Sequence, residues 1–263
     1  MTLKVLDLFS GIGGFSLGLE RTGGFETVAF CEIEEFPRKV LRKHWPEVPI
    51  YEDVRTLTAD QLERDGISIE VICGGFPCQD LSVAGKQAGI TAERSGLWSE
   101  IARLVGELQP RYVIVENVTN LLSGPSEQRG GWFGRVLGDL AALGYDAEWH
   151  CIPASYVGAR QLRDRVWIMA YPECYGIQGR AYITEAWQSK SREEQLAGLV
   201  QPCAWPTVSS ARDCGTGHGI PNGIHRNKSI GNAVVPEIPE MIGHAILQAE
   251  ANNPHKPTVI SDT

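Results

Sequence analysis

The sequence predicts an α/β protein in which a mostly parallel β-sheet carries helices on both faces. Two observations predict this class. Apolar runs typical of buried strands alternate with segments of helical spacing over residues 3–171, and a glycine-rich turn, SGIGG, follows the first run. A third observation adds a second unit. Residues 172–228 are rich in Gly, Pro, Ser, Gln and Trp with little periodicity, which indicates a small loop-rich subdomain.

The expected elements alternate along the chain. The strands are apolar runs bounded by turn residues, and they cover 3–9, 26–33, 69–73, 111–118, 145–152 and 165–171. The helices have apolar side chains at helical spacing, and they cover 15–23, 35–44, 97–109, 136–144, a short stretch at 191–199, and 238–251. The last residues, 253–263, lack such a pattern and are expected to fray.

The composition is that of a water-soluble globular protein. The chain has 263 residues, of which 43% are hydrophobic and 21% charged, and no apolar run reaches the roughly 20 residues that span a bilayer. The N-terminus runs directly into a strand pattern without a basic leader, so we expect a cytoplasmic protein that does not bind membranes. Seven scattered cysteines without a CxxC pair favour neither disulfides nor a metal site, and most are expected to be small core residues.

Charge is unevenly distributed along the chain. The formal net charge is −8, which by itself argues against a polyanionic partner. Residues 151–236, however, carry nine Lys or Arg against six Asp or Glu, whereas the segments on either side are acidic. The weakly basic segment is therefore the candidate surface for phosphate contacts.

Four residue clusters follow successive strands. SGIGG comes after the first strand, Glu32 ends the second, FPCQ (76–79) follows the third, and ENV (116–118) ends the fourth. In an open parallel sheet, ligands bind beyond the carboxyl ends of the strands, so these clusters are expected to meet at one site. Each also has a plainer interpretation, because a glycine turn can be a simple connection and Glu32 a surface carboxylate. Asp53, which could receive an amino group, could equally be a capping residue.

Cys78 and Glu116 suggest a chemistry. Pro77 stiffens the turn that presents the Cys78 thiol, and no histidine lies nearby in sequence, which disfavours a Cys–His hydrolase. A carboxylic acid beside a nucleophilic thiol suits an electron-poor ring, because the acid can hydrogen-bond a ring nitrogen and make the ring electrophilic. Arg163 and Arg165 in QLRDR, with Arg160 just ahead, could orient a carbonyl group, or could simply lie on a solvated edge strand.

These clusters, in this order, resemble the DNA (cytosine-5) methyltransferase family. The resemblance rests on DLFSGIGGFSLGLE (7–20), GGFPCQDLSVAGKQAG (74–89), ENV, QLRDR and GNAVVP (231–236), and it covers about three quarters of the chain. It implies a Rossmann-like fold that uses S-adenosyl-L-methionine. The short region before GNAVVP resembles compact phage- or prophage-type members. Because the last motif returns to the cofactor in this family, residues 1–171 and 229–252 should form one discontinuous catalytic domain, with 172–228 as the target-recognition domain.

The resemblance also implies a role for each matching residue. Cys78 would add to carbon 6 of a flipped-out cytosine, Glu116 would engage ring nitrogen 3 and the amine, and Arg163 would contact the carbonyl oxygen. Arg165 would anchor this arrangement, and Gln79 would line the catalytic loop. The residues expected around the cofactor are Phe9, Gly11, Gly14, Glu32, Asp53, Pro77, Leu97, Asn232 and Ala233. Those expected to face DNA are Ser82, Gly85, Lys86, Gln87, Trp187, Arg192, Trp205, Arg212, Arg226 and Lys228.

The implied partner is double-stranded DNA, with a cognate restriction endonuclease as a further partner and a monomer as the expected state. Two alternatives remain open. The same chemistry could act on RNA, although the signature of tRNA-directed relatives is not found in the recognition region. The short recognition region is also compatible with a catalytically weak DNA-binding relic, although Cys78, Glu116, Arg163 and Arg165 are all present.

Overall fold

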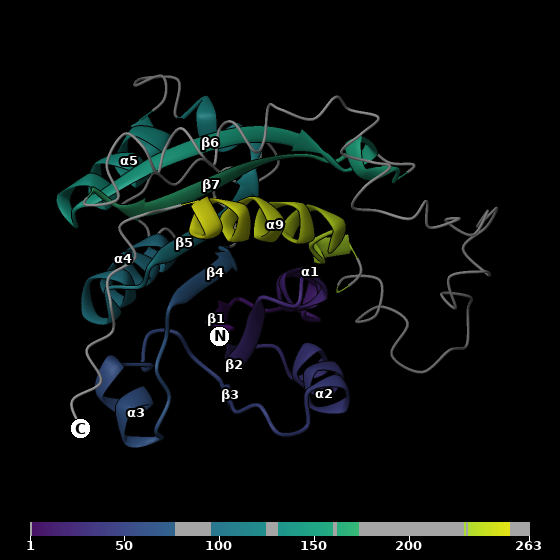
Figure 1. The fold of residues 1–263 in the computed structure, drawn as a ribbon, viewed down its shortest axis with the longest axis vertical. Coiled ribbons are helices and arrows are strands. Elements are labelled where there is room, and N and C mark those ends of the chain that lie inside the picture. The colour runs from purple at the N-terminus through teal and green to yellow at the C-terminus, as the bar shows by residue number, and fades with distance from the viewer. Residues whose placement is uncertain are drawn as a thin grey trace.

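The computed structural model describes residues 2–76, 96–124, 131–159, 162–173, 229 and 231–252. Its described strands form one seven-stranded sheet in the order β3-β2-β1-β4-β5-β7-β6 (Figure 1). The strands are β1 (Leu3–Leu8), β2 (Phe25–Cys31), β3 (Ile50–Tyr51), β4 (Val71–Gly75), β5 (Tyr112–Val118), β6 (Tyr145–Pro153) and β7 (Asp164–Pro172). The helices are α1 (Gly14–Arg21), α2 (Glu35–His44), α3 (Ala59–Arg64), α4 (Gly96–Leu108), α5 (Gly131–Ala142) and α9 (Glu237–Asn252). Short 3₁₀ turns, η1 (Thr119–Leu122) and η2 (Ala154–Val157), follow β5 and β6.

The predicted α/β class is confirmed, with one antiparallel strand in an otherwise parallel sheet. Strands β1 to β5 pair in parallel, whereas β7 runs antiparallel to both β5 and β6. The interior strand β5, which lies between β4 and β7, is buried along Tyr112–Val115, as expected for a strand covered on both faces. Because β7 is reversed, its first residues lie at the edge where β5 ends.

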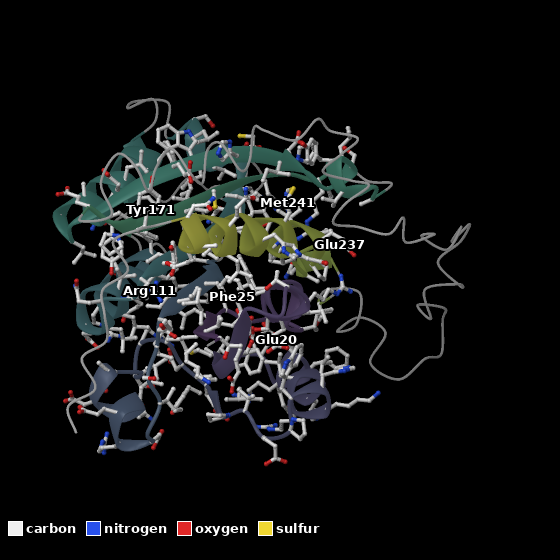
Figure 2. All side chains as sticks on the ribbon, in the orientation of Figure 1. Glu20, Phe25, Arg111, Tyr171, Glu237 and Met241 are labelled. Atoms are coloured by element: carbon white, nitrogen blue, oxygen red, sulfur yellow. The ribbon has the colours of Figure 1, made fainter. Side chains whose placement is uncertain are left out.

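Helices cover both faces of the sheet through two hydrophobic clusters. One face packs mainly against α4 and α5, with Leu62 of α3, and the other packs against α1 and α9. Figure 2 labels Phe25 and Met241 in the second cluster, where the far C-terminal helix α9 lies beside the N-terminal helix α1. The two ends of the described chain therefore build one core.

Several boundaries differ from those predicted from the sequence. Strand β4 continues through Gly74 and Gly75, which pair with Val115 and Glu116, because the neighbouring backbones support glycines that have little strand propensity of their own. Helix α5 begins at Gly131 rather than residue 136. The sequence analysis did not predict β3 or α3, since β3 has only two residues and α3 only six. Of the cysteines that the structure describes, Cys31 and Cys73 are buried, in line with the expectation that most are core residues, whereas Cys151 is exposed on the edge strand β6.

Candidate functional site

Most of the predicted site residues that the structure describes lie along one edge of the sheet, at the carboxyl ends of β1, β2, β4 and β5 and the start of β7. Two of them, Phe9 (φ 53°) and Arg163 (φ 32°), adopt left-handed backbone conformations. Such conformations are uncommon for side-chain-bearing residues and cluster at functional sites. Arg163 therefore departs from the extended segment expected for QLRDR, because β7 begins only at Asp164.

Glu32 organises the turn that follows β1. Its side chain is buried, with one carboxylate oxygen accepting a hydrogen bond from the backbone N–H of Gly11 at 2.7 Å and the other from Glu34 N–H at 2.7 Å. Burial raises the pKa of Glu32 more than these two donors lower it. Each carboxylate oxygen retains acceptor capacity, so Glu32 fits the role of receiving a pair of ribose hydroxyls.

Asp7, near the end of β1, supports the helix that follows the same turn. It lies on β1 with no exposed surface, and Ser16 Oγ on α1 donates to its Oδ2 at 2.7 Å. The N-cap residue of α1 is Gly13, which has no side chain to cap the helix. The Asp7 carboxylate, on β1, instead accepts a hydrogen bond from Ser16 in the first turn of α1. Burial raises the pKa of Asp7 to about 8, against the lowering effect of Ser16.

Asp53 follows the short strand β3. Its carboxylate is held by Arg55, whose Nη2 lies 2.7 Å from Oδ2 and whose backbone N–H donates to Oδ1 at 3.0 Å. These contacts lower the pKa of Asp53, so the group is a carboxylate at neutral pH. With two oxygens available as acceptors, Asp53 can still accept from an exocyclic amino group. The sequence analysis did not consider Arg55 as its partner.

The GNAVVP segment lies against α1. A Cβ atom on Gly14 would come within 2.5 Å of the Val234 carbonyl oxygen, and one on Gly18 within 2.1 Å of the Pro236 carbonyl oxygen. Only glycine permits this approach of the two backbones. On its other side, the segment accepts a hydrogen bond at its Gly231 carbonyl from Arg163 Nη1, at 2.8 Å. The segment therefore joins the cofactor half of the edge to the catalytic half, and Asn232 and Ala233 lie between these contacts.

Glu116 and Arg165 form the centre of the half of this edge that is the candidate catalytic site. Arg165 Nε lies 2.9 Å from Glu116 Oε1, and the Glu116 side chain is only 13% exposed. The two residues share one face of the sheet, because Arg165 pairs with Val118 across the β5–β7 ladder. Gly75 lies directly beside Glu116 on β4, where any Cβ would come within 2.9 Å of Oε2. The lack of a side chain at Gly75 thus leaves room for the Glu116 carboxyl group.

Burial and charge act in opposite directions on Glu116. Burial raises its pKa, and the nearby Arg165 and Arg163 only partly reverse that effect. The net result is a carboxyl group whose pKa lies above its usual value, which favours the protonated form. Such a group can donate a hydrogen bond to an acceptor on a substrate ring. The pKa of Arg163 is lowered, first by burial and then by the charge of Arg165.

Asn117 and Ile33 are candidate functional residues that the sequence analysis missed. Buried Asn117 donates from Nδ2 to the Phe76 carbonyl oxygen at 3.2 Å, two residues before Cys78 in sequence. This hydrogen bond fixes the chain where β4 ends. The signal in the sequence that could have identified Asn117 is a side-chain amide near the end of a predicted buried strand. Ile33 follows Glu32 and is 60% exposed, which is unusual for an isoleucine beside a candidate ligand site.

The remaining predicted residues are distributed as follows. Leu97, at the start of α4, is half-buried against the cluster on that face of the sheet. Outside the described residues lie Pro77, Cys78, Gln79, Ser82, Gly85, Lys86, Gln87, Arg160, Trp187, Arg192, Trp205, Arg212, Arg226 and Lys228.

The described part of the chain contains neither a candidate metal cluster nor a helix that could span a membrane. Among those residues, no group of three or more His, Cys, Asp or Glu side chains is placed to hold a metal ion. No described helix has both the length and the apolar character needed to cross a membrane.

Comparison of the sequence with known families and proteins gives consistent matches. A family model described as C-5 cytosine-specific DNA methylase matches residues 3–211. The Type II methyltransferase M.Sau3AI of Staphylococcus aureus is 35% identical over 182 residues, covering 65% of this chain and 44% of that protein. The Type II methyltransferase M.HgiCII of Herpetosiphon aurantiacus is 34% identical over 206 residues, covering 78% of this chain and 44% of that protein. The chain thus spans less than half the length of either relative.

Solved structures show the same fold. A prophage-encoded DNA modification methyltransferase from E. coli superimposes with a TM-score of 0.55 at 29% identity, covering 66% of this chain and 47% of that chain. The Entamoeba histolytica methyltransferase EhMeth gives a TM-score of 0.58 at 14% identity, covering 94% and 98% of the two chains. At that identity the second match supports the fold alone, which is the Rossmann-like fold of methyltransferases.

Proposed function

Because this chain belongs to the C-5 cytosine-specific DNA methylase family, we propose that it transfers a methyl group from S-adenosyl-L-methionine to carbon 5 of cytosine in double-stranded DNA. The single observation that carries the proposal is the buried Glu116 carboxyl group, paired with Arg165 where β5 and β7 meet. This group lies beside Gly75, three residues before Cys78 in sequence. The acid therefore lies near the end of β5, and the nucleophile follows the neighbouring strand β4 in sequence.

The proposed reaction begins at Cys78. Its thiolate forms a bond to carbon 6 of a cytosine that has been flipped out of the stack. The electron pair of the C5=C6 double bond moves through carbon 4 towards ring nitrogen 3, where the Glu116 carboxyl group donates a hydrogen bond or proton. Arg163 would contact the carbonyl oxygen, releasing or sharing its bond to Gly231, while Arg165 holds Glu116 in place.

Methyl transfer and release complete the cycle. S-adenosyl-L-methionine would supply an electrophilic methyl group on a sulfonium, which carbon 5 takes with its electron pair, leaving a neutral thioether. A base, such as water, then removes the carbon 5 proton. The electrons of that C–H bond re-form the C5=C6 double bond and expel the Cys78 thiolate. Any proton that nitrogen 3 accepted returns to Glu116, which restores the aromatic ring and the free enzyme.

The cofactor would be held at the ends of β1, β2 and β3. Glu32 would accept hydrogen bonds from the ribose hydroxyls, and Asp53 would accept one from the adenine amino group. The exposed Ile33 side chain would pack on the adenine ring. Phe9, Gly11, Gly14, Asn232 and Ala233 would complete the site, since they belong to the two backbone segments that meet at α1. Pro77 and Leu97 would flank it.

Covalent trapping tests the proposal. A duplex carrying 5-fluorocytosine and S-adenosyl-L-methionine should yield an adduct that survives a denaturing gel, because the fluorine on carbon 5 cannot leave as a proton does. Cys78→Ala should yield no adduct while still binding the duplex. A wild-type chain that binds both the duplex and the cofactor yet forms no adduct would overturn the proposed chemistry.

Substrate class and partners need a second measurement. Methyl incorporation into duplex DNA should exceed that into tRNA, and the reverse result would move the proposal to RNA. Bisulfite sequencing of DNA from cells expressing the chain should reveal methylated cytosines in one short sequence. That sequence would also be the site that a cognate restriction endonuclease, the partner we propose, fails to cut after methylation.

A further inference from the structure

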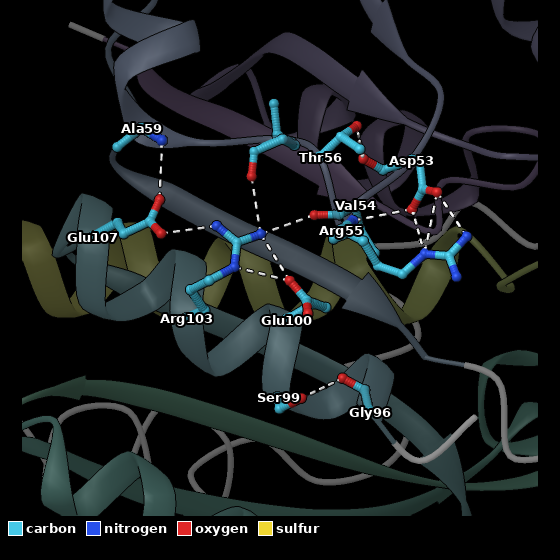
Figure 3. A network of polar contacts seen from close by, with 11 residues as sticks. Asp53, Val54, Arg55, Thr56, Ala59, Gly96, Ser99, Glu100, Arg103 and Glu107 are labelled. Carbon is cyan, nitrogen blue, oxygen red and sulfur yellow. Dashed lines mark hydrogen bonds and ion pairs between the residues drawn. The ribbon is translucent and has the colours of Figure 1, made fainter. Parts of the chain in front are cut away.

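Arg103 lies on α4 and binds the segment that follows Asp53 (Figure 3). Its Nη2 donates to two backbone carbonyl oxygens, those of Val54 and Leu57, both at 2.9 Å. The side chains of Val54 and Leu57 are buried, so both ends of this short turn are fixed. A single planar guanidinium thus holds the turn by its backbone, independently of the side chains there.

Two carboxylates orient the Arg103 guanidinium in turn. Glu100 lies 2.8 Å away and Glu107 lies 2.8 Å away, one turn of α4 on either side of Arg103. Glu107 also accepts a hydrogen bond at 3.0 Å from the backbone N–H of Ala59, at the start of α3. Helix α4 therefore holds residues 54–59 through three backbone groups, which gives this turn a rigid support.

Asp53 begins the turn that Arg103 holds. Its carbonyl oxygen accepts hydrogen bonds from the backbone N–H groups of Thr56 at 3.0 Å and Leu57 at 3.2 Å. Its carboxylate is clamped by Arg55, as Figure 3 shows. The direction in which the Asp53 carboxylate faces thus depends on a turn whose last carbonyl is bound by Arg103. No contact in the described structure links Arg103 directly to the candidate cofactor residues themselves.

We propose that Arg103 is a positioning residue that sets the affinity of the site for the 6-amino group of adenine, acting through Asp53. This inference rests on the proposed function, in which Asp53 receives that amino group. Hydrogen bonds need donor and acceptor within a few tenths of an ångström, so a small shift of the turn weakens this contact first. The ribose contact through Glu32 comes from a different strand and should be unaffected.

Calorimetric titration with two ligands tests the inference. S-adenosylhomocysteine carries the 6-amino group, and its hypoxanthine analogue, S-inosylhomocysteine, carries an oxygen there instead. Arg103→Gln should weaken binding of the adenine ligand about tenfold, the loss of one good hydrogen bond, and change binding of the hypoxanthine ligand at most about twofold. Combining it with Asp53→Ala, which removes the acceptor oxygens, should add little further loss, because both changes remove the same contact.

Two control variants make the result interpretable. Lys39→Gln removes an exposed ion pair with Glu35 on α2 and should leave both affinities unchanged. Arg103→Lys keeps the charge but cannot bind two carbonyls and two carboxylates at once, so it should give an intermediate loss. If Arg103→Gln does not fold, Arg103→Lys and Glu107→Ala, which loses both the Ala59 and the Arg103 contact, carry the same comparison.

Each outcome has one meaning. If the wild-type chain binds neither ligand, the proposed cofactor and this inference both fail. If it binds S-adenosylhomocysteine and the Arg103 variants bind it equally well, only the inference is overturned. Equal weakening of both ligands would also overturn it, because Arg103 would then support the whole site rather than the adenine contact.

Discussion

Glu116 combines burial with two nearby arginines, and its chemistry depends on which effect dominates. Because burial is the larger effect, the pKa of Glu116 is raised, and its protonated form is the one able to donate to a ring nitrogen. Activity that depends on this form should be present below the raised pKa and be lost as the pH rises through it. The Arg165 pair holds the group in position and partly offsets the effect of burial on its pKa.

Glu116→Gln should therefore lower kcat by at least about 100-fold, the range expected for loss of a general acid. Gln keeps the volume and a hydrogen-bonding group, so the fold and the cofactor affinity should be retained. Single-turnover methyl transfer measures the loss, with circular dichroism to check folding. Glu52→Gln, which removes an exposed glutamate paired with Arg38, is the matched control. Equal activity in both variants would contradict the assignment of Glu116.

The raised pKa of Asp7 predicts an effect on the stability of the fold rather than on the reaction rate. Its pKa is about 8 in the folded chain against an ordinary value of 3.8, so the folded state binds an extra proton between these two values. This contribution to stability is fully present below pH 3.8 and is lost as the pH rises towards about 8. The slope from this one group reaches at most about 1.4 kcal/mol per pH unit.

Asp7→Asn should flatten that part of the pH dependence, because Asn cannot titrate yet can still accept from Ser16. Urea unfolding of both proteins between pH 5 and pH 8 measures the difference between their slopes. Other groups with raised pKa values that do not interact with Asp7, such as Glu116, contribute equally to both proteins and cancel in the comparison. Parallel curves for the two proteins would show that Asp7 does not keep its proton.

At the scale of elements, the contact between α1 and residues 234–236 sets how closely the turn that follows β1 approaches the GNAVVP segment. Gly18 lies within α1, where the Pro236 carbonyl oxygen occupies the space a Cβ would need. Gly138 lies within α5 and has nothing within 4 Å of its Cβ position. The two helical glycines thus differ in surroundings while sharing the same intrinsic helix propensity.

Gly18→Ala should lower the free energy of unfolding by about 1–3 kcal/mol, because the backbones must move apart. Gly138→Ala should raise it by about 0.5–1 kcal/mol, since alanine is the better helix former and meets no obstacle. Thermal or chemical unfolding of both variants measures the signs. A stabilising Gly18→Ala would mean that the segment 234–236 does not lie against α1.

At the scale of the whole molecule, α9 completes a core that begins at the other end of the chain. Nine of its residues are buried, and it packs against α1 and the sheet. Arg21 on α1 pairs with Glu237 at 3.4 Å, and Tyr112 on β5 donates to Glu250 at 2.6 Å. The helix is therefore joined at both ends to elements that precede it by more than 100 residues.

Removing residues 237–263 should abolish cooperative folding, because it uncovers the face of the sheet that α1 only partly covers. Removing 253–263 alone keeps all of α9 and should leave the unfolding transition in place. Urea titrations followed by circular dichroism compare the two truncations. If the chain without residues 237–263 still unfolds cooperatively, residues 2–173 hold a core without α9.

The α/β class, most strand positions and the clusters at the strand ends could be predicted from the sequence, because period and turn chemistry are local properties. The sequence also carries the motifs that identified the family, since residue types in a fixed order need no coordinates. It did not reveal β3 or α3, which are too short to show a period, and it did not predict that Cys151 is exposed.

Only the tertiary structure decided which groups become partners. The Glu116–Arg165 pair depends on the reversed direction of β7, and the Arg103 support of the Asp53 turn joins residues about 50 positions apart. Likewise, the raised pKa of Asp7 comes from burial between β1 and α1. These are properties of burial and distance between separate elements, and such distances follow from packing rather than from any local pattern of residues.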